Sequence, residues 1–422
     1  MNEIRLRSPL VVIIISMFFI TSCGGRSSSK TDNIEPTVVE EEGPPIEIPQ
    51  GKVQVGVYYF PNFGPEHSSE WPSIKSALPQ FAGHQQPKVP AWGYTNENDP
   101  KDMAQKIDAA ADHGIDAFIF DWYYYDEGSA ASFGESSSWQ GNKFLHKALE
   151  EGFLKATNND KLQFSLMWAN HDLGPNVKGA VKQETFEALT DYVIKTYFKH
   201  PSYWKIDGAP YFSIYEFHTF LQIFDNDYAK AAVAIERFRT KVKAAGFPDL
   251  HLNGVLWGLK GEVLNNAVQY FKLNSATSYV WIHHFELPSF PSTEYAVAAE
   301  GYFNGVASGG ANNGLEKPAS NIPIPYHINV SMGWDSSPRC KNSDDWMTRR
   351  DYPFGPVIVN NTPSLFKKYL SKAKEWTMTK PENERIITIN SWNEWGEGSY
   401  LEPDEVNGMG YLEAVKEVFG TE

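Results

Sequence analysis

Cysteine is scarce in this sequence, with two among 422 residues, Cys23 and Cys340. Cys23 lies in an N-terminal leader, so no pair of cysteines is left to form a disulfide within the folded part of the chain. Cys340 has no His and Asn context that suggests a nucleophile. We therefore expect Cys340 to be a structural or an exposed thiol.

Positive charge and cofactor motifs are also lacking. The chain carries 37 Lys and Arg against 52 Asp and Glu, a formal net charge of −15, which disfavours nucleic acid as a partner. No Gly-x-Gly-x-x-Gly follows a predicted strand and no Gly-x-Ser-x-Gly is present, so neither a dinucleotide site nor a serine elbow is supported. His283 and His284 would point to opposite faces of an extended chain. Because no spacing of His, Asp and Glu is typical of a metal site, we expect neither a metal nor a cofactor.

The first 22 residues have the pattern of a signal peptide. Arg5 and Arg7 precede an almost wholly apolar run, residues 9–20, that is too short for a comfortable transmembrane helix. The four residues that end in Cys23 resemble a bacterial lipobox, which implies cleavage before Cys23 and a lipid on its sulfur. An ordinary signal peptide with an incidental cysteine is the alternative. The lipobox predicts a protein anchored in the bacterial cell envelope, at the outer membrane or cell surface.

A polar segment follows the leader. Residues 24–30 are rich in Gly and Ser, and residues 35–49 are acidic and rich in Pro. Such a composition cannot bury a core and behaves as a flexible tether. We therefore divide the chain into a lipoprotein signal peptide (1–22), a tether (23–50) and one catalytic domain (51–422), which we expect to be a monomer.

From residue 53 onward, strand and helix patterns alternate. The helix that begins at Asp99-Pro100 is an example, because Asp is a favoured N-cap and Pro a favoured first helical residue. Eight strands separated by helices predict the α/β class and a single (β/α)8 TIM barrel with long βα loops. The predicted strands are 53–60, 115–120, 162–167, 211–216, 250–255, 276–280, 326–330 and 386–390, and the predicted helices include 99–113, 144–154, 184–197, 228–245, 364–376 and 410–418.

Aromatic and polar side chains recur where the predicted strands end. In a (β/α)8 barrel these ends share one face, which holds the active site, so residues distant in sequence should converge there. Each ring could equally pack in the core, Asp121 could cap a helix or join a salt bridge, and His171 could be a surface residue. The predicted substrate-binding residues are Tyr59, Asp121, Trp122, Tyr123, Trp168, Asn170, His171, Tyr215, Trp392, Asn393 and Trp395.

Two carboxylates stand out just after the last predicted strand. Glu394 and Glu397 lie three residues apart, beside Trp392 and Trp395. Flat rings stack on the C–H faces of sugars, and paired carboxylates supply the acid and the base of glycosidic cleavage. Close carboxylates beside apolar rings also push their pKa values apart, which this division of roles requires. A pair of exposed loop acids is the alternative, and we expect Glu402 nearby to have a structural role.

The chain resembles the glycoside hydrolase family 99-like group, specifically the WbsX-like proteins, over most of residues 53–419. The resemblance rests on Tyr58-Tyr59-Phe60-Pro61, on residues 112–118 leading into Asp121-Trp122-Tyr123, and above all on Trp392-Asn393-Glu394-Trp395-Gly396-Glu397-Gly398. It implies a (β/α)8 barrel that cleaves α-mannosidic linkages internally, with retention. The family motif has His where this chain has Gly396, and this departure leaves the sugar specificity open.

The resemblance also implies a role for each glutamate. Glu397 would be the general acid/base at the glycosidic oxygen, and Glu394 would deprotonate the 2-hydroxyl of the sugar. That hydroxyl would attack the anomeric carbon to give a 1,2-anhydro sugar, which water then opens. No covalent bond to the protein would form.

These observations predict a secreted, lipid-anchored glycoside hydrolase that acts on α-linked, mannan-like or related oligo- or polysaccharides. One alternative is a surface glycan-binding protein with the same barrel and aromatic residues but no turnover. Another is a glycosyltransferase of polysaccharide biosynthesis, since some relatives carry that label. A transferase would need a site for the diphosphate of its donor and access to the cytoplasm, and the signal peptide opposes this.

Lipidation of Cys23 predicts that Cys23→Ala releases the protein from the membrane fraction, because the anchoring chain is lost. Fractionation of cells that express the wild type or the variant would measure this. Unchanged membrane association of the variant would contradict the lipobox interpretation.

Overall fold

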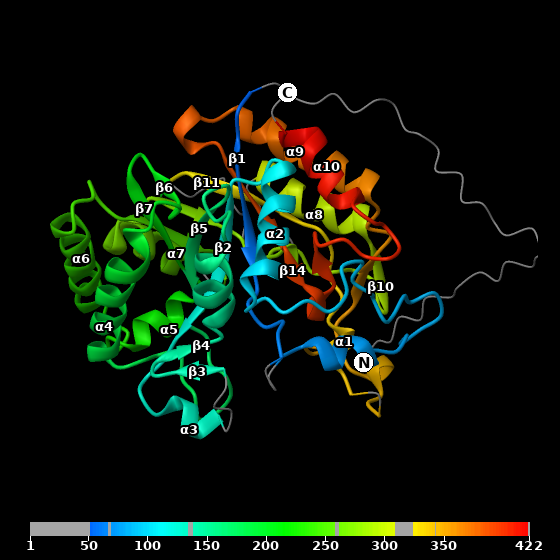
Figure 1. Ribbon diagram of the computed structural model, residues 1–422, viewed down its shortest axis with the longest axis horizontal. Coiled ribbons are helices and arrows are strands. Elements are labelled where there is room, and N and C mark those ends of the chain that lie inside the picture. The colour runs from blue at the N-terminus through cyan, green and yellow to red at the C-terminus, as the bar shows by residue number, and fades with distance from the viewer. Residues whose placement is uncertain are drawn as a thin grey trace, which may run out of the picture. The chain divides into compact units, whose positions relative to one another are not determined.

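A closed ring of eight parallel strands forms the centre of the protein. The computed structural model describes residues 51–65, 69–133, 138–257, 261–308, 324–341 and 343–420. Each strand pairs in parallel with the next, and the last pairs with the first, so the ring has no free edge (Figure 1). The strands are β1 (Gln54–Tyr59), β2 (Ala117–Tyr124), β5 (Gln163–Trp168), β7 (Ala209–Ile214), β8 (His251–Val255), β9 (Ser275–Thr277), β11 (Tyr326–Ser331) and β13 (Ile386–Asn390).

Helical segments connect successive strands and cover the outside of the ring, as Figure 1 shows. The connection from β2 to β5 is a π-helical turn, η1, followed by a 3₁₀ turn, η2. The segments are α2 (Pro100–Asp112), η1 (Ala148–Gly152) with η2 (Phe153–Lys155), α4 (Gln183–Val193), α6 (Tyr228–Ala244), α7 (Gly261–Phe271), α8 (Tyr295–Ser308), α9 (Pro363–Met378) and α10 (Gly410–Phe419). This is the predicted (β/α)8 barrel, and the prediction is confirmed.

Local sequence accounts for much of this arrangement. The side chain of Asp99 accepts a hydrogen bond from the Lys101 amide, and Pro100 is the first residue of α2, as predicted. Such a cap contributes about 1 kcal/mol. The strands are buried along nearly their whole length because the core packs inside the ring and the helices pack outside.

One predicted helix is wrong in its first turn. Residues 144–154 were expected to be helical, but Phe144 belongs to the short strand β4 (Lys143–Phe144) and pairs with Tyr123 near the end of β2. Pairing and burial of Phe144 outweigh its local helical pattern. A further short strand, β3 (Trp139–Gln140), pairs with β4. Four further helices were not predicted. Three are short and lie in loops that follow strands, α1 (Trp71–Ser76), α3 (Ser129–Phe133) and α5 (Phe217–Gln222), and the fourth is α8, one of the helices that cover the barrel.

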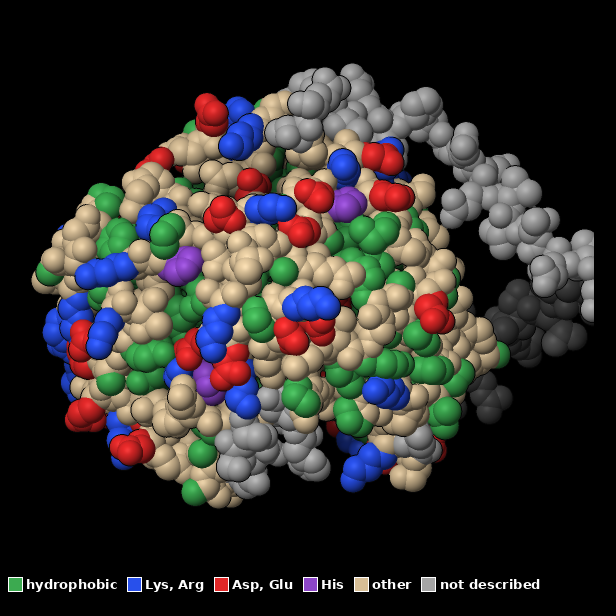
Figure 2. Space-filling model, viewed as in Figure 1, with side chains coloured by type: hydrophobic (Ala, Val, Ile, Leu, Met, Phe, Trp, Pro, Cys, Tyr) green, Lys and Arg blue, Asp and Glu red, His purple; other side chains and the backbone are tan. Residues whose placement is uncertain are grey.

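Charged side chains of both signs are interspersed over the face shown in Figure 2. On that face no basic patch of the kind that binds nucleic acid is visible. Among the described residues, every helix is too short or too polar to cross a membrane.

The barrel interior contains a stack of rings from three strands. His251 of β8 lies 5.1 Å from Tyr211 of β7, and His327 of β11 lies 5.8 Å from the same tyrosine, measured between ring centroids. Burial lowers the pKa of His251 to about 4, and it lowers the pKa of His327 as well. Both imidazoles are therefore neutral near pH 7.

This burial predicts a pH-dependent contribution to stability. The unfolded chain binds a proton on His251 near pH 6.5, whereas the folded chain does so only near pH 4. The contribution of His251 is therefore fully present above pH 6.5 and is lost as the pH falls toward 4. We expect the difference in unfolding free energy between the wild type and His251→Gln to shift against the wild type by up to about 3 kcal/mol over this range. Urea unfolding of both proteins at several pH values would measure it, and a constant difference would contradict the prediction.

Candidate active site

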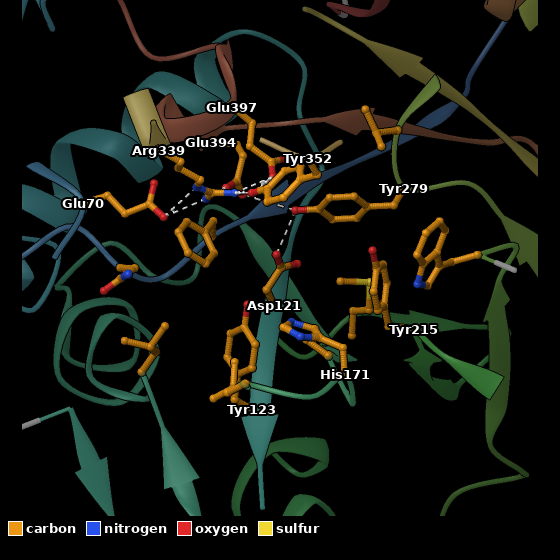
Figure 3. A pocket seen from close by; sticks show the side chains of 18 of the residues that line it. Glu70, Asp121, Tyr123, His171, Tyr215, Tyr279, Arg339, Tyr352, Glu394 and Glu397 are labelled. Atoms are coloured by element: carbon orange, nitrogen blue, oxygen red, sulfur yellow. Dashed lines mark hydrogen bonds and ion pairs between the residues drawn. The ribbon is translucent and has the colours of Figure 1, made fainter. Parts of the chain in front are cut away.

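A cavity of about 750 Å³ opens where the barrel strands end. It receives side chains from the loops after most of the strands, at the face where (β/α)8 enzymes hold their active sites. Figure 3 shows its acidic and aromatic residues turned toward a common space. The lining includes Phe60, Asn62, Glu70, Asp121, Tyr123, His171, Tyr215, Trp257, Tyr279, His283, Trp334, Arg339, Tyr352, Glu394 and Glu397.

Arg339 connects the two predicted catalytic glutamates. It ends the 3₁₀ turn η5 (Ser337–Arg339), and its Nη2 donates to Glu394 Oε1 at 2.7 Å. Its Nη1 donates to Glu397 Oε1. The planar guanidinium thus bonds to both carboxylates at once, a geometry that lysine could not reproduce (Figure 3).

The same arginine also binds a third carboxylate. Arg339 Nη2 lies 2.7 Å from Glu70 Oε1, and its Nε donates to the same oxygen at 3.0 Å. Glu70 is the N-cap residue of α1. Tyr352 adds a hydrogen bond from its hydroxyl to Glu397 Oε1, at 3.1 Å. Three carboxylates and a phenol therefore surround one cation.

A tyrosine joins the glutamate pair to the opposite acid. The hydroxyl of Tyr279 lies 2.9 Å from Asp121 Oδ2 and 3.3 Å from Glu394 Oε2. A phenol has one proton to donate, so it can serve one of these carboxylates at a time. The second oxygen of Asp121, Oδ1, is buried and has no hydrogen-bond partner among the described residues. It is an acceptor turned toward the cavity, suited to a hydroxyl of a ligand.

Burial dominates the electrostatics of the acids. It raises the pKa of Glu394 well above its usual range, and the neighbouring Glu397 raises it further, while Arg339 opposes both effects. Burial also raises the pKa of Glu397, Arg339 lowers it and Glu70 raises it. Asp121 likewise has a raised pKa because it is buried. Carboxylic acids that keep a proton near neutral pH can act as general acids.

The motif that contains the two glutamates is held from behind by Glu402. Trp392 Nε1 donates to Glu402 Oε1 at 2.9 Å, and Trp395 Nε1 donates to Glu402 Oε2 at 2.7 Å. Lys106 of α2, which is completely buried, lies 2.6 Å from the same carboxylate. Both indoles therefore point away from the cavity, and the expected structural role of Glu402 matches this position.

A second buried carboxylate completes the support. Glu97 lies 2.9 Å from Lys106 Nζ and accepts a hydrogen bond from the side chain of Asn393. Asn393 also binds both the amide and the carbonyl of Phe60, each at 2.8 Å. The amide of Asn393 thus joins the motif to the end of β1 rather than to a ligand.

Six of the predicted site residues line the cavity together. They are Asp121, Tyr123, His171, Tyr215, Glu394 and Glu397. Asp121 and Tyr123 lie in the second half of β2, His171 and Tyr215 follow β5 and β7, and the two glutamates belong to the motif. Burial lowers the pKa of His171, so this imidazole is a neutral group that can accept or donate one hydrogen bond.

The other seven predicted binding residues lie in the core and do not line the cavity, which corrects that part of the prediction. Trp122, Trp168, Trp392 and Trp395 are almost completely buried, and Tyr59 packs on Phe118 and Phe120. Asn170 holds the backbone of Glu216 through two hydrogen bonds. Successive strand residues point to opposite sides, so half of each aromatic cluster must face the helices. The residues concerned are Tyr59, Trp122, Trp168, Asn170, Trp392, Asn393 and Trp395.

Several lining residues were missed from the sequence. Glu70, Arg339 and Tyr352 lie in loops without a recognisable motif, and only the fold brings them together. Tyr279 and Trp257 could have been found, because each lies just after a barrel strand. Trp257 and Tyr352 are 39% and 55% exposed, respectively, so both rings are accessible for stacking on a sugar.

Position 396 is glycine for a steric reason. A Cβ atom there would overlap Glu70 Oε2 and come within 3.0 Å of Arg339 Nε. Gly398 is required for a different reason, because its φ of 61° is left-handed and its Cα packs against Asp335. The carboxylate of Glu70 therefore occupies the space that a side chain at 396 would fill.

The remaining predictions concern other parts of the chain. Cys23 lies outside the described residues. Cys340 is a free, partly buried thiol, and burial raises its pKa to about 11, so it is a poor nucleophile near pH 7. Within the described ranges, no group of three or more His, Cys, Asp or Glu residues is placed to hold a metal ion.

Comparison with known proteins identifies similar sequences. A family model described as Glycosyltransferase WbsX matches residues 66–415. The uncharacterized protein WxcX of Xanthomonas campestris pv. campestris (strain B100) is 24% identical over 387 residues, which cover 85% of this chain and 48% of that protein. The chain thus spans about half the length of the curated relatives it matches.

Solved structures share the fold. A glycoside hydrolase-like protein matches with a TM-score of 0.56 and 15% identity, over 90% of this chain and 98% of that chain. The GH99 endo-alpha-mannosidase of Bacteroides thetaiotaomicron has a TM-score of 0.49 and 15% identity, over 86% of this chain and 96% of its own. The first of these likenesses supports the barrel architecture.

The buried support predicts a large loss of stability in Glu402→Gln. The variant removes one charge from a buried group of three and leaves Lys106 with a single carboxylate partner. We expect the free energy of unfolding to fall by about 3–5 kcal/mol, the usual effect of breaking a buried ion pair. Urea unfolding would measure this, with exposed Glu405→Gln as the matched control. Equal stability of the two variants would contradict the role of Glu402.

Proposed function

The chain belongs to the family described as Glycosyltransferase WbsX, and we propose that within this family it is a glycoside hydrolase that cleaves α-linked glycans. The supporting observation is the pair of enclosed carboxylates, Glu394 and Glu397, bound to opposite amino groups of one arginine at the open end of the barrel. Glycosidic cleavage requires one acid that holds a proton and one carboxylate that is ionised. Burial raises the pKa of both glutamates, that of Glu394 the more, and Arg339 opposes both shifts, so the two acids differ in their affinity for a proton.

The two glutamates have distinct environments, which suggests distinct roles. The side chain of Glu397 is 12% exposed, whereas that of Glu394 is 3% exposed and lies beside Tyr279. The resemblance of the motif to glycoside hydrolase family 99, and not the order of the pKa values, leads us to assign Glu397 as the general acid that protonates the glycosidic oxygen as the leaving group departs. We assign Glu394 as the base that accepts the proton of the 2-hydroxyl of the sugar.

The proposed reaction proceeds in two steps, each of which forms one bond to the anomeric carbon and breaks another. In the first, the 2-hydroxyl loses its proton to Glu394 and its oxygen bonds to the anomeric carbon, while the bond from that carbon to the glycosidic oxygen breaks and the leaving oxygen takes the proton of Glu397. In the second, Glu397 accepts a proton from water and the water oxygen bonds to the anomeric carbon, while the bond from that carbon to the 2-oxygen breaks and the 2-oxygen regains its proton from Glu394. The two inversions give net retention, and the protein forms no covalent bond to the sugar.

The walls of the cavity fit a polyhydroxylated substrate. Tyr123, Tyr215 and Trp257 supply flat apolar surfaces, and Asp121 and His171 supply hydrogen-bonding groups. Cavities of this volume accommodate small organic ligands. We propose an α-linked, mannan-like or related glycan as the substrate.

A sugar-nucleotide transferase is a weaker alternative, although the family description uses that word. Its donor carries a diphosphate, which needs cations or free donors. The cavity contains four carboxylates, Glu70, Asp121, Glu394 and Glu397, and the guanidinium of Arg339 is already bound to three of them. Such a site repels a diphosphate.

A non-catalytic glycan-binding protein is the other alternative. Its site would need aromatic rings and hydrogen-bonding groups, but not two carboxylates forced close together in a buried position. Keeping such a pair is costly because each charge loses its hydration. This cost favours an enzyme.

We further propose that a lipid on Cys23 anchors the protein in the bacterial cell envelope.

The hydrolase proposal predicts that Glu394→Gln and Glu397→Gln each lower kcat by roughly 10²–10⁴-fold, the usual contribution of one general acid or base. Folding should be preserved because each variant removes one of three carboxylates that share Arg339, which still leaves the guanidinium two acidic partners. The assay incubates the full chain in detergent with a panel of α-linked polysaccharides, α-mannans included, and follows products by chromatography. Exposed Glu375→Gln on α9 is the matched control.

Each outcome discriminates between the alternatives. Products from the wild type and Glu375→Gln, but not from the two variants, would support the hydrolase. Retention of a glycan by all four proteins without any product would overturn it in favour of a binding protein. Full activity of either active-site variant would refute the assignment of that glutamate.

A further inference from the structure

Glu70 reaches the active site from a part of the chain far from the motif. Its carboxylate lies directly over Gly396, in space that any Cβ atom at that position would occupy. Gly396 does not have a left-handed φ, so the backbone itself would tolerate another residue there. The glycine is therefore needed for the room it leaves to Glu70.

Glu70 and the two glutamates compete for one cation. Arg339 gives Nε and Nη2 to Glu70 Oε1, Nη2 to Glu394 Oε1 and Nη1 to Glu397 Oε1. The donors of Arg339 are thereby shared among three acceptors, and Glu70 Oε2 has no partner among the described residues. The guanidinium of Arg339 also lies 5.7 Å from the centroid of the Phe60 ring.

This sharing has an electrostatic consequence. A guanidinium facing only Glu394 and Glu397 would hold both of them ionised, and neither could then protonate a leaving group. Glu70 offsets part of that positive charge. The effects on the pKa of each glutamate agree with the geometry, since Arg339 lowers both values and Glu70 raises both. The titratable and charged groups that face the pair are Glu70, Asp121, Tyr123, Tyr215, Tyr279, Arg339 and Tyr352.

We propose that Glu70 and Arg339 are a positioning pair for the active site: Arg339 orients Glu394 and Glu397, and Glu70, admitted by Gly396, limits the charge that Arg339 places on them. Neither residue needs to contact the reacting atoms. The inference rests on the proposed function for its role in turnover, but not for its effect on the two glutamates. The pair also explains why the motif has glycine at position 396, since a larger residue there would displace Glu70.

The proposal predicts opposite movements of the pH profile. A reaction that needs one protonated and one ionised carboxylate has a bell-shaped dependence of kcat/KM on pH. Glu70→Gln removes a negative charge, so both apparent pKa values should fall and the bell should move to lower pH by roughly half to one unit. Arg339→Met removes the cation, so the bell should move to higher pH by a similar amount.

Three controls separate this role from a structural one. The double variant with Glu70→Gln and Arg339→Met should have its bell between those of the single variants. Arg339→Lys keeps the charge but not the fork, so its bell should stay near that of the wild type while kcat falls roughly tenfold or more. Glu375→Gln should change neither. Lower rates with an unmoved bell in both single variants would overturn the proposal.

Titration of the carboxylates tests the pair without turnover. Carbon-13 NMR of glutamate-labelled protein, with Glu394→Gln and Glu397→Gln used for assignment, reports their apparent pKa values directly. Three results would support the pair even if no glycan is cleaved. The pKa values should be lower than in the wild type in Glu70→Gln, higher than in the wild type in Arg339→Met, and near those of the wild type in Arg339→Lys. Unchanged values in Glu70→Gln would overturn it, even if the protein is an active hydrolase.

The fit of Glu70 over Gly396 can be tested by stability. Gly396→Ala should lower the free energy of unfolding by roughly 1–3 kcal/mol, as overpacking does, and Glu70→Ala in the same chain should restore part of that loss. This pattern is a coupling between two residues in contact. Additive effects of the two substitutions would contradict the proposed exclusion.

Discussion

The buried ion pair of Lys106 with Glu97 and Glu402 is the interaction on which the active site depends. Three charged groups lie out of water, an arrangement that is stable only when hydrogen bonds satisfy them. Those bonds come from Trp392, Asn393 and Trp395 of the motif. The motif is thereby fixed to α2 and to the end of β1, and its two glutamates, Glu394 and Glu397, face the cavity. The tryptophans of the motif thus anchor the loop, and its glutamates line the cavity.

A second electrostatic arrangement, on the open side of the same loop, has a larger excess of acid. Behind the motif, one cation serves two carboxylates that accept hydrogen bonds from indole and amide groups. In front of it, one cation serves three carboxylates, and acceptor oxygens of Glu70 and Asp121 are left without partners among the described residues. Acid is thus in excess where a ligand can enter. Under the proposed function, this excess disfavours phosphate-bearing donors, and Asp121 provides an acceptor for a hydroxyl group of the glycan.

The parallel barrel makes this convergence possible. Its strands all end on one face, so Asp121 and Glu397 come close although they are distant in sequence. Tyr279 contacts both Asp121 and Glu394, and Arg339 binds both Glu394 and Glu397. The family description names a transferase, whereas we propose hydrolysis from the arrangement of the acids. The two activities act on the same anomeric carbon, and the charge around the leaving group decides which donor a cavity can accept.

The sequence by itself determined the eight strands and the glutamate pair, because buried parallel strands are local apolar runs and the two acids lie three residues apart in one segment. It could not determine which aromatic residues face the cavity, since strand residues alternate between the two sides of the sheet and the register is set by pairing. Trp392 and Trp395 point inward because Glu402 accepts a hydrogen bond from each indole there, and Lys106 compensates the charge of that carboxylate. Glu70 and Arg339 were decided by tertiary structure alone. They are separated by 269 positions in the chain. Only closure of the barrel places the carboxylate of Glu70 over Gly396, and no local sequence pattern indicates a contact between residues so far apart.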